Sequence, residues 1–126
     1  MATLFPTDHG LNRSAPALPL LMREAGSFAA MRAKASFAAP VETGVKGDGR
    51  AVMVLPGFLA SDIATSRLRK SLNGAGFRAY GWGLGRNAGI KADLFDRLDR
   101  RLDMLNLDQP LTLIGWSLGG LVAREY

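Results

Sequence analysis

The residues best suited to chemistry are a serine and two glycines near the end of the chain. Gly115, Ser117 and Gly119 form a Gly-x-Ser-x-Gly pentad, which follows a short apolar run at residues 111–114. A strand, a tight turn and a helix are the setting in which such a serine is a nucleophile with a projecting hydroxyl. Side chains at the two glycines would collide with the neighbouring strand and helix. The pattern predicts a nucleophilic Ser117, and the alternative is an ordinary structural turn.

A serine that attacks a carbonyl carbon needs donors for the oxyanion that forms. One is the N–H of Leu118, directly after the nucleophile, at the start of a helix whose dipole favours negative charge. The second is expected from the Pro-Gly turn after the first apolar strand, through the N–H of Phe58 or Leu59. The alternative for this turn is a plain strand-to-helix connection.

The nucleophile also needs a general base. The only histidine, His9, lies in a polar tail before any expected helix or strand, where an imidazole is poorly oriented. Nothing after Ser117 in this chain supplies a base. The absence of cysteine excludes disulfides, thiolate metal sites and a cysteine nucleophile.

A second glycine cluster, Gly83, Gly85 and Gly89, follows a strand and precedes a helix, as in a dinucleotide-binding loop. This cluster follows the second strand rather than the first, and the next strand ends at the serine pentad instead of an acidic residue. A loop that lines the active site is therefore favoured. Arg86 and Asn87 within it either contact substrate or hold the ends of the loop together.

The elements that must position these residues alternate between strand and helix. Residues 50–55 are apolar at nearly every position, which is typical of a strand covered on both faces. Ser61 or Asp62 is expected to cap the helix that follows. Further strands are expected at 77–82 and 111–115, with helices up to residue 73, at 90–105 and after the pentad. Such alternation predicts an α/β fold, with a mostly parallel sheet and helices on both faces.

The first 49 residues are expected to form a separate segment, and residues 50–126 the domain that carries the site. Residues 1–17 read as a polar lead-in, 18–37 as a helix, and 38–49 as a linker rich in glycine. The helix is expected to dock on its own domain; an interfacial helix and a partner-binding helix are the alternatives.

Composition excludes several classes of protein. The net charge of +5 comes from arginines on solvated helix faces, without a dense basic run interleaved with aromatics, so no nucleic-acid binding is expected. No apolar run is long enough to span a membrane, and the start of the chain lacks the pattern of a signal peptide. A cytoplasmic protein is expected.

Three blocks of sequence, residues 52–58, 80–87 and 113–120, together resemble the α/β-hydrolase superfamily, and most closely its bacterial esterases and lipases. The resemblance covers residues 50–126. It implies a three-layer α/β-hydrolase-like sandwich and a small-molecule ester substrate. By this resemblance, Ser117 would attack the acyl carbon, a histidine would take its proton, and the N–H groups of Phe58 and Leu118 would hold the oxyanion. Water would then release the acyl group, and no metal or cofactor would be needed.

The chain departs from this family in two respects. Many relatives have His-Gly where this chain has Pro56-Gly57. The family's triad acid and histidine follow the elbow helix, whereas this chain stops at Tyr126, nine positions past Ser117. We therefore expect the N-terminal half of a hydrolase, inactive and unstable alone because its last strand lacks the rest of the sheet. The alternatives are a non-catalytic hydrolase-like binding module and an acyltransferase that uses an alcohol or thiol acceptor.

Overall fold

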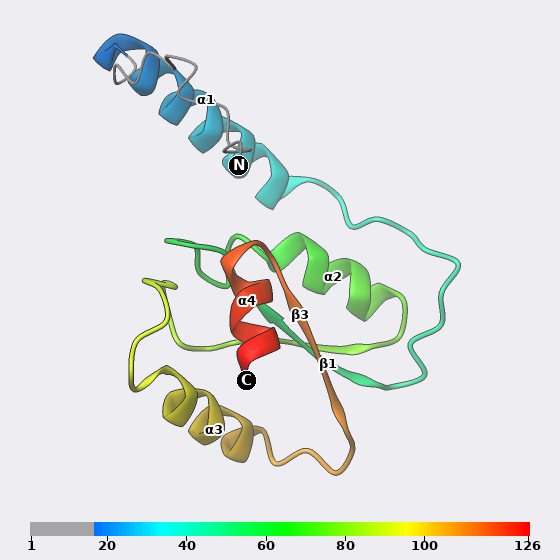
Figure 1. Ribbon diagram of the computed structural model, residues 1–126. Coiled ribbons are helices and arrows are strands. Elements are labelled where there is room, and N and C mark those ends of the chain that lie inside the picture. Colours follow the sequence, from blue (N-terminus) through cyan, green and yellow to red (C-terminus); the bar gives the residue numbers. More distant parts are fainter. Residues whose placement is uncertain (1–16) are drawn as a thin grey trace, which may run out of the picture. The chain divides into compact units, whose positions relative to one another are not determined.

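The computed structural model describes residues 17–126, apart from side chains at positions 21, 32 and 35–37. The chain divides into two units, the first ending at Met31 and the second spanning Arg32–Tyr126. Helix α1, Leu18–Phe37, covers the predicted residues, with Pro19 in its first turn, where a missing N–H breaks no helical hydrogen bond (Figure 1). None of the helices in the described part of the chain combines the length and apolar character needed to cross a membrane.

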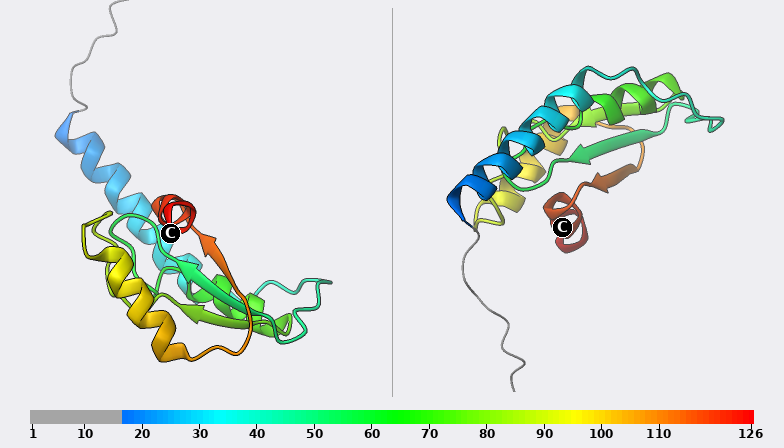
Figure 2. Two further views of the ribbon diagram at one scale, coloured as in Figure 1. Left: turned by 60° about the horizontal axis from the view of Figure 1, so that its bottom comes forward. Right: turned by 90° about the horizontal axis from the view of Figure 1, so that it is seen from above.

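Three parallel strands form the sheet: β1 Ala51–Leu55, β2 Arg78–Gly81 and β3 Leu111–Gly115 (Figure 2). The spatial order is β2-β1-β3, so β1 is central. All five residues of β1 are buried, which confirms the prediction of a strand covered on both faces. A parallel sheet needs such a strand because helices from the crossover connections cover each side.

The helices that follow the strands are α2 Ser66–Gly74, α3 Leu94–Leu105 and α4 Leu118–Glu125. The chain moves from β1 to β2 in one direction and then back past β1 to β3. Right-handed crossovers in opposite directions place α2 and α3 on opposite faces of the sheet (Figure 1). The predicted α/β class is therefore confirmed.

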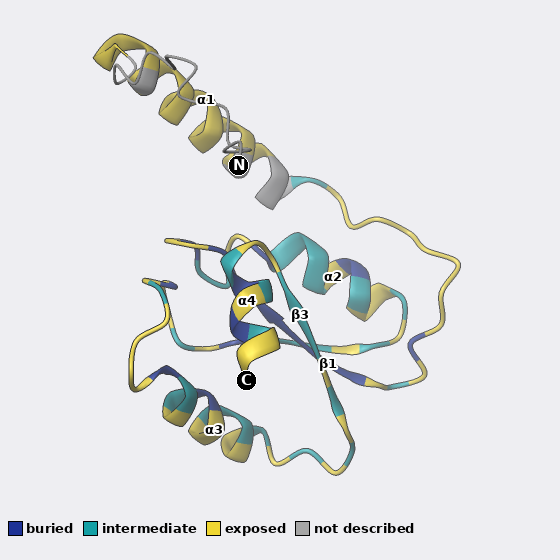
Figure 3. Cartoon of the chain, in the orientation of Figure 1, coloured by how far each residue is buried: buried dark blue, intermediate teal, exposed yellow. Residues whose placement is uncertain are grey.

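The hydrophobic core lies where α3 and α4 pack against one face of β1. Its buried members are two residues apart on β1 and four residues apart on α3, as burial on one face requires. In Figure 3 the strand β1 is coloured as buried, whereas α3 and α4 each carry both buried and exposed positions. The buried members of the core are Met53, Leu55, Trp82, Leu94, Leu98 and Val122. Leu102 and Leu105 pack against this cluster as well, so the leucines of α3 form one face of the helix.

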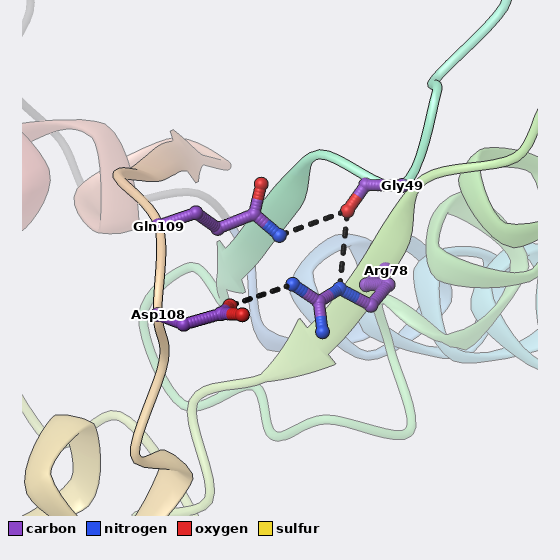
Figure 4. Close-up of polar contacts among 4 residues, drawn as sticks. All are labelled: Gly49, Arg78, Asp108 and Gln109. Carbon is purple, nitrogen blue, oxygen red and sulfur yellow. Dashed lines mark hydrogen bonds and ion pairs between the residues drawn. The ribbon is translucent and has the colours of Figure 1, made fainter.

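Polar side chains tie the strands together at their amino ends (Figure 4). The carbonyl oxygen of Gly49 accepts hydrogen bonds from Arg78 Nε and from Gln109 Nε2, each at 3.0 Å. Arg78 Nη2 also lies 3.4 Å from Asp108 Oδ1, in an exposed ion pair. An exposed pair of this kind adds little stability, so these contacts mainly align the three strand starts.

Two helices start later than the sequence predicted. The expected cap at Ser61 or Asp62 is wrong, because residues 62–65 form successive turns and α2 begins only at Ser66. Helix α3 begins at Leu94 rather than at Ile90. Two acidic residues of this region stand four positions before an arginine. Asp93 and Arg97 form an ion pair at 4.0 Å, whereas among the described residues positions 96 and 100 form none.

Candidate active site

The carboxyl ends of β1 and β3 form the topological switch point of the sheet. The strands are neighbours, and Leu55 pairs with Gly115. The turn after β1 leads to α2, whereas the turn after β3 leads to α4, which packs with α3 on the opposite face. Ligands of open α/β sheets bind where adjacent connections diverge in this way. The fold thus brings the turn after β1 and the serine pentad together at such a place.

Ser117 has a backbone conformation that an L-residue rarely adopts, with φ 52° and ψ −119°. A non-glycine residue in such a region is strained, and strain of this kind concentrates at functional sites. The residue is exposed, and its side chain makes no capping bond to α4. No hydrogen-bond partner for the hydroxyl lies within the described residues. The hydroxyl is therefore held in the open at the first turn of a helix.

The two glycines of the pentad allow close packing around the serine. A Cβ atom at Gly119 would lie 2.3 Å from the carbonyl oxygen of Leu55, at the end of β1. One at Gly115 would lie 2.2 Å from the backbone nitrogen of Gly120, in α4. Real Cβ atoms do not make contacts this short. The predicted collisions with the neighbouring strand and helix are confirmed.

Two backbone N–H groups beside Ser117 have no acceptor among the described residues, those of Phe58 and Leu118. Leu118 is the first residue of α4, whose opening N–H groups lack intrahelical partners. Leu59 is the alternative oxyanion donor after β1. Its N–H donates to the carbonyl oxygen of Asn87 at 2.7 Å and is therefore not free.

Gly57 brings the turn after β1 close to the serine. A Cβ atom placed on it would lie 3.2 Å from Trp116 Cδ1 and 3.4 Å from Ser117 Cβ. The turn that contains Phe58 therefore packs directly against the elbow, with little room for a side chain between them.

Asn87 lies in the glycine-rich loop and is fully buried. Its side-chain Nδ2 donates to the carbonyl oxygen of Pro56 at 2.8 Å, and its Oδ1 accepts from the N–H of Gly89 at 3.1 Å. Arg86, beside it, is exposed. Asn87 therefore holds loops together rather than contacting a substrate, because its side chain is not open to a ligand.

Asp62 also joins the two loops, by contacts that the sequence did not reveal. Its carboxylate accepts the N–H groups of Trp82 and Gly83, each at 3.0 Å. A Cβ atom at Gly81 would lie 2.6 Å from Asp62 Cγ, so the glycine is needed for this approach. A carboxylate thus occupies the first amides of the glycine-rich loop, where a dinucleotide phosphate would need free donors. This geometry argues against the dinucleotide-binding alternative.

The glycines of that loop have a conformational explanation as well. Gly83, Gly85 and Gly89 all have positive φ angles, of 72°, 77° and 103°. Residues with a Cβ atom rarely adopt such angles, so the conformation of the loop backbone alone accounts for the spacing of the glycines. Among the residues that the structure describes, no group of three or more histidine, cysteine or acidic side chains is placed to hold a metal ion.

An apolar groove of about 550 Å³ lies along α2. Its lining includes Val41, Val45, Leu68 and Trp116, but neither Ser117 nor Phe58. The groove therefore adjoins the elbow through the indole of Trp116 without containing the groups suited to chemistry.

No histidine that could act as a general base lies among the described residues, and His9 lies outside them. Comparison with protein families, curated proteins and solved structures finds no match. An exposed serine on a strained turn, beside two unpaired N–H donors, is suited to attack a carbonyl and to hold the resulting anion.

Proposed function

We propose that the protein is a serine hydrolase of the α/β-hydrolase superfamily, acting on carboxylic esters through an acyl-enzyme on Ser117. The observation that carries the proposal is the backbone of Ser117, at φ 52° and ψ −119° with an exposed side chain. A role in nucleophilic catalysis explains why the backbone is strained at this one serine. The serine lies beside unpaired N–H donors, at the switch point of a parallel sheet. A plain strand-to-helix turn needs none of these features.

In the first step the Ser117 oxygen attacks the ester carbonyl carbon while a general base removes the hydroxyl proton. The N–H groups of Phe58 and Leu118 hold the oxyanion of the tetrahedral intermediate. The carbon–oxygen bond to the alcohol then breaks, and the alcohol leaves with the proton. Water attacks the acyl-enzyme in the same way and releases the carboxylic acid.

The described residues contribute the nucleophile and the oxyanion donors to this reaction. A base from outside the described residues completes it. Removal of a single oxyanion donor typically lowers kcat by about 10²–10³-fold, so these two N–H groups account for a large share of the expected rate.

Covalent labelling with a fluorophosphonate tests the proposal. The complete gene product that carries these residues is incubated with the probe beside a Ser117→Ala variant, and the labelled peptide is located by mass spectrometry. We expect one adduct, on Ser117, that the variant lacks. A folded gene product that acquires no adduct would overturn the proposal and favour a non-catalytic binding module.

A further inference from the structure

The turn that carries Phe58 has a conformation that its own residues do not favour. The N–H of Ala60 donates to the carbonyl oxygen of Gly57 at 3.0 Å, which closes a β-turn over Phe58 and Leu59. Leu59 has a φ of 56°, in the left-handed region where a leucine is strained. Contacts from elsewhere must hold this turn in place.

Asn87 supplies those contacts through three hydrogen bonds. Its N–H donates to the carbonyl oxygen of Ala60 at 2.8 Å, and its carbonyl oxygen accepts the N–H of Leu59 at 2.7 Å. Its side-chain amide donates to the carbonyl oxygen of Pro56 at 2.8 Å. These bonds flank Phe58 on both sides, and none of them uses the Phe58 N–H.

Only an amide side chain of this length makes both side-chain bonds. The group must donate to Pro56 and accept from Gly89 at once, and it is fully buried. A buried donor or acceptor left without a partner is costly, so neither an aliphatic side chain nor a carboxylate replaces it well. A carboxylate would also set its charge against the Pro56 carbonyl oxygen.

We propose that Asn87 is a positioning residue for catalysis, which holds the turn after β1 so that the Phe58 N–H stays free beside Ser117. The proposal rests on the proposed function of Ser117. Asn87 itself does not touch the substrate; it acts through the main chain of residues 56–60.

The test is the pH dependence of fluorophosphonate labelling in an Asn87→Asp variant of the complete gene product. The labelling rate of the variant is divided by the wild-type rate at the same pH. Both proteins share the titration of the general base, so it does not affect this ratio. Circular dichroism gives the folded fraction, so that rates refer to folded protein. Among the residues that the structure describes, every hydrogen-bond partner of Asn87 is a main-chain atom, so none of those partners brings a charged side chain to the introduced carboxyl.

At high pH we expect the variant to label about tenfold or more slowly, because a misplaced donor forfeits part of the roughly 10²–10³-fold that one donor contributes. As pH falls, the introduced carboxyl becomes protonated and again donates to Pro56, so the ratio should rise towards one. Burial should place this transition above the pKa of about 3.9 of an exposed aspartate. If Asn87 had a purely structural role, the substitution would lower the folded fraction, and the ratio of labelling rates per folded molecule would not rise as pH falls.

Asn73→Asp is the matched control. Asn73 Oδ1 accepts the N–H of Ala79 at 2.8 Å, and a carboxylate accepts this bond equally well. Its rate ratio should stay near one at every pH.

The outcomes separate the two proposals. If wild-type protein does not label at Ser117, the proposed function fails. If it labels and the folded Asn87→Asp variant matches it at every pH, only the positioning role fails. A variant that folds at no pH would make Asn87 a folding residue and would overturn the positioning role as well.

Discussion

At the scale of single residues, the backbone strain at Ser117 has a measurable cost. We expect Ser117→Gly to be more stable than Ser117→Ala by about 1 kcal/mol. Glycine relieves strain of roughly 1–3 kcal/mol but adds about 0.5–1 kcal/mol of chain entropy to the unfolded state. Both variants lack the hydroxyl, so their difference isolates the backbone. Urea unfolding measures it, and a less stable glycine variant would show that position 117 carries no strain.

The residues of the site differ in how far the sequence reveals them. Ser117 and its glycines form a local pattern, and the collisions that explain the glycines follow from that pattern. The sequence indicates a helix cap at Ser61 or Asp62 instead, because the actual partners of Asp62 are backbone amides some 20 positions away. Gly81, which precedes these amides, and Gly83, which carries one of them, are the available signal. The role of Asn87 depends on burial, which periodicity does not predict inside a loop.

At the scale of elements, the packing of α4 against β1 depends on Gly119. Gly119→Ala should destabilise the protein by about 3 kcal/mol, because the new Cβ would lie 2.3 Å from the Leu55 oxygen and must force the two elements apart. Gly120→Ala is the control, since its Cβ would meet nothing closer than 3.5 Å. Alanine is favoured over glycine in helices by up to about 1 kcal/mol, so this variant should be unchanged or more stable. Equal losses in thermal unfolding would contradict the packing argument.

The contact between α3 and Tyr126, the residue that follows α4, should depend on pH. Its phenol hydrogen-bonds to Asp99, and this bond, partial burial and the charges of Asp99 and Asp103 raise the pKa of Tyr126 from 10.0 to about 12. The folded state therefore holds the phenolic proton more tightly than the unfolded chain does. The stabilisation is fully present below pH 10 and is lost as pH rises through about 12.

Tyr126→Phe provides the comparison for this dependence. The stability difference between wild type and the variant should be constant below pH 10 and should shrink between pH 10 and about 12. Denaturant unfolding at several pH values measures the difference, and the absorbance of tyrosinate reports the titration itself. A difference that does not change with pH would rule out the Tyr126–Asp99 bond as its source.

Periodicity predicted the long elements better than their ends. The continuous apolar run of β1 and the leucine spacing of α3 each reflect burial, which acts on every residue of an element. The sequence predicts the start of α3 four residues too early, because residues 90–93 have ordinary helix-forming composition but follow a glycine with a φ of 103°. Loop geometry of this kind depends on partners distant in sequence.

At the scale of the whole molecule, β3 is an edge strand: no described strand pairs with its side away from β1. Such an edge exposes N–H and C=O groups that pair with other chains. We expect the polypeptide of residues 1–126 to associate as its concentration rises. Thr112→Lys places a charge at an exposed position of β3 and should suppress this association. Sedimentation velocity measures the association of the unsubstituted polypeptide and of the variant. Equal association of these two proteins would show that another surface is responsible.

The central position of β1 affects how solvent deuterium enters the protein. Both edges of this strand are paired, and all of its side chains are buried. Local fluctuations that open a loop or a helix end leave its amides protected. Deuterium should therefore reach Val52, Met53 and Val54 only when the sheet unfolds as a whole. The exchange rates of these three amides then report the global free energy of unfolding, without denaturant and without an activity assay.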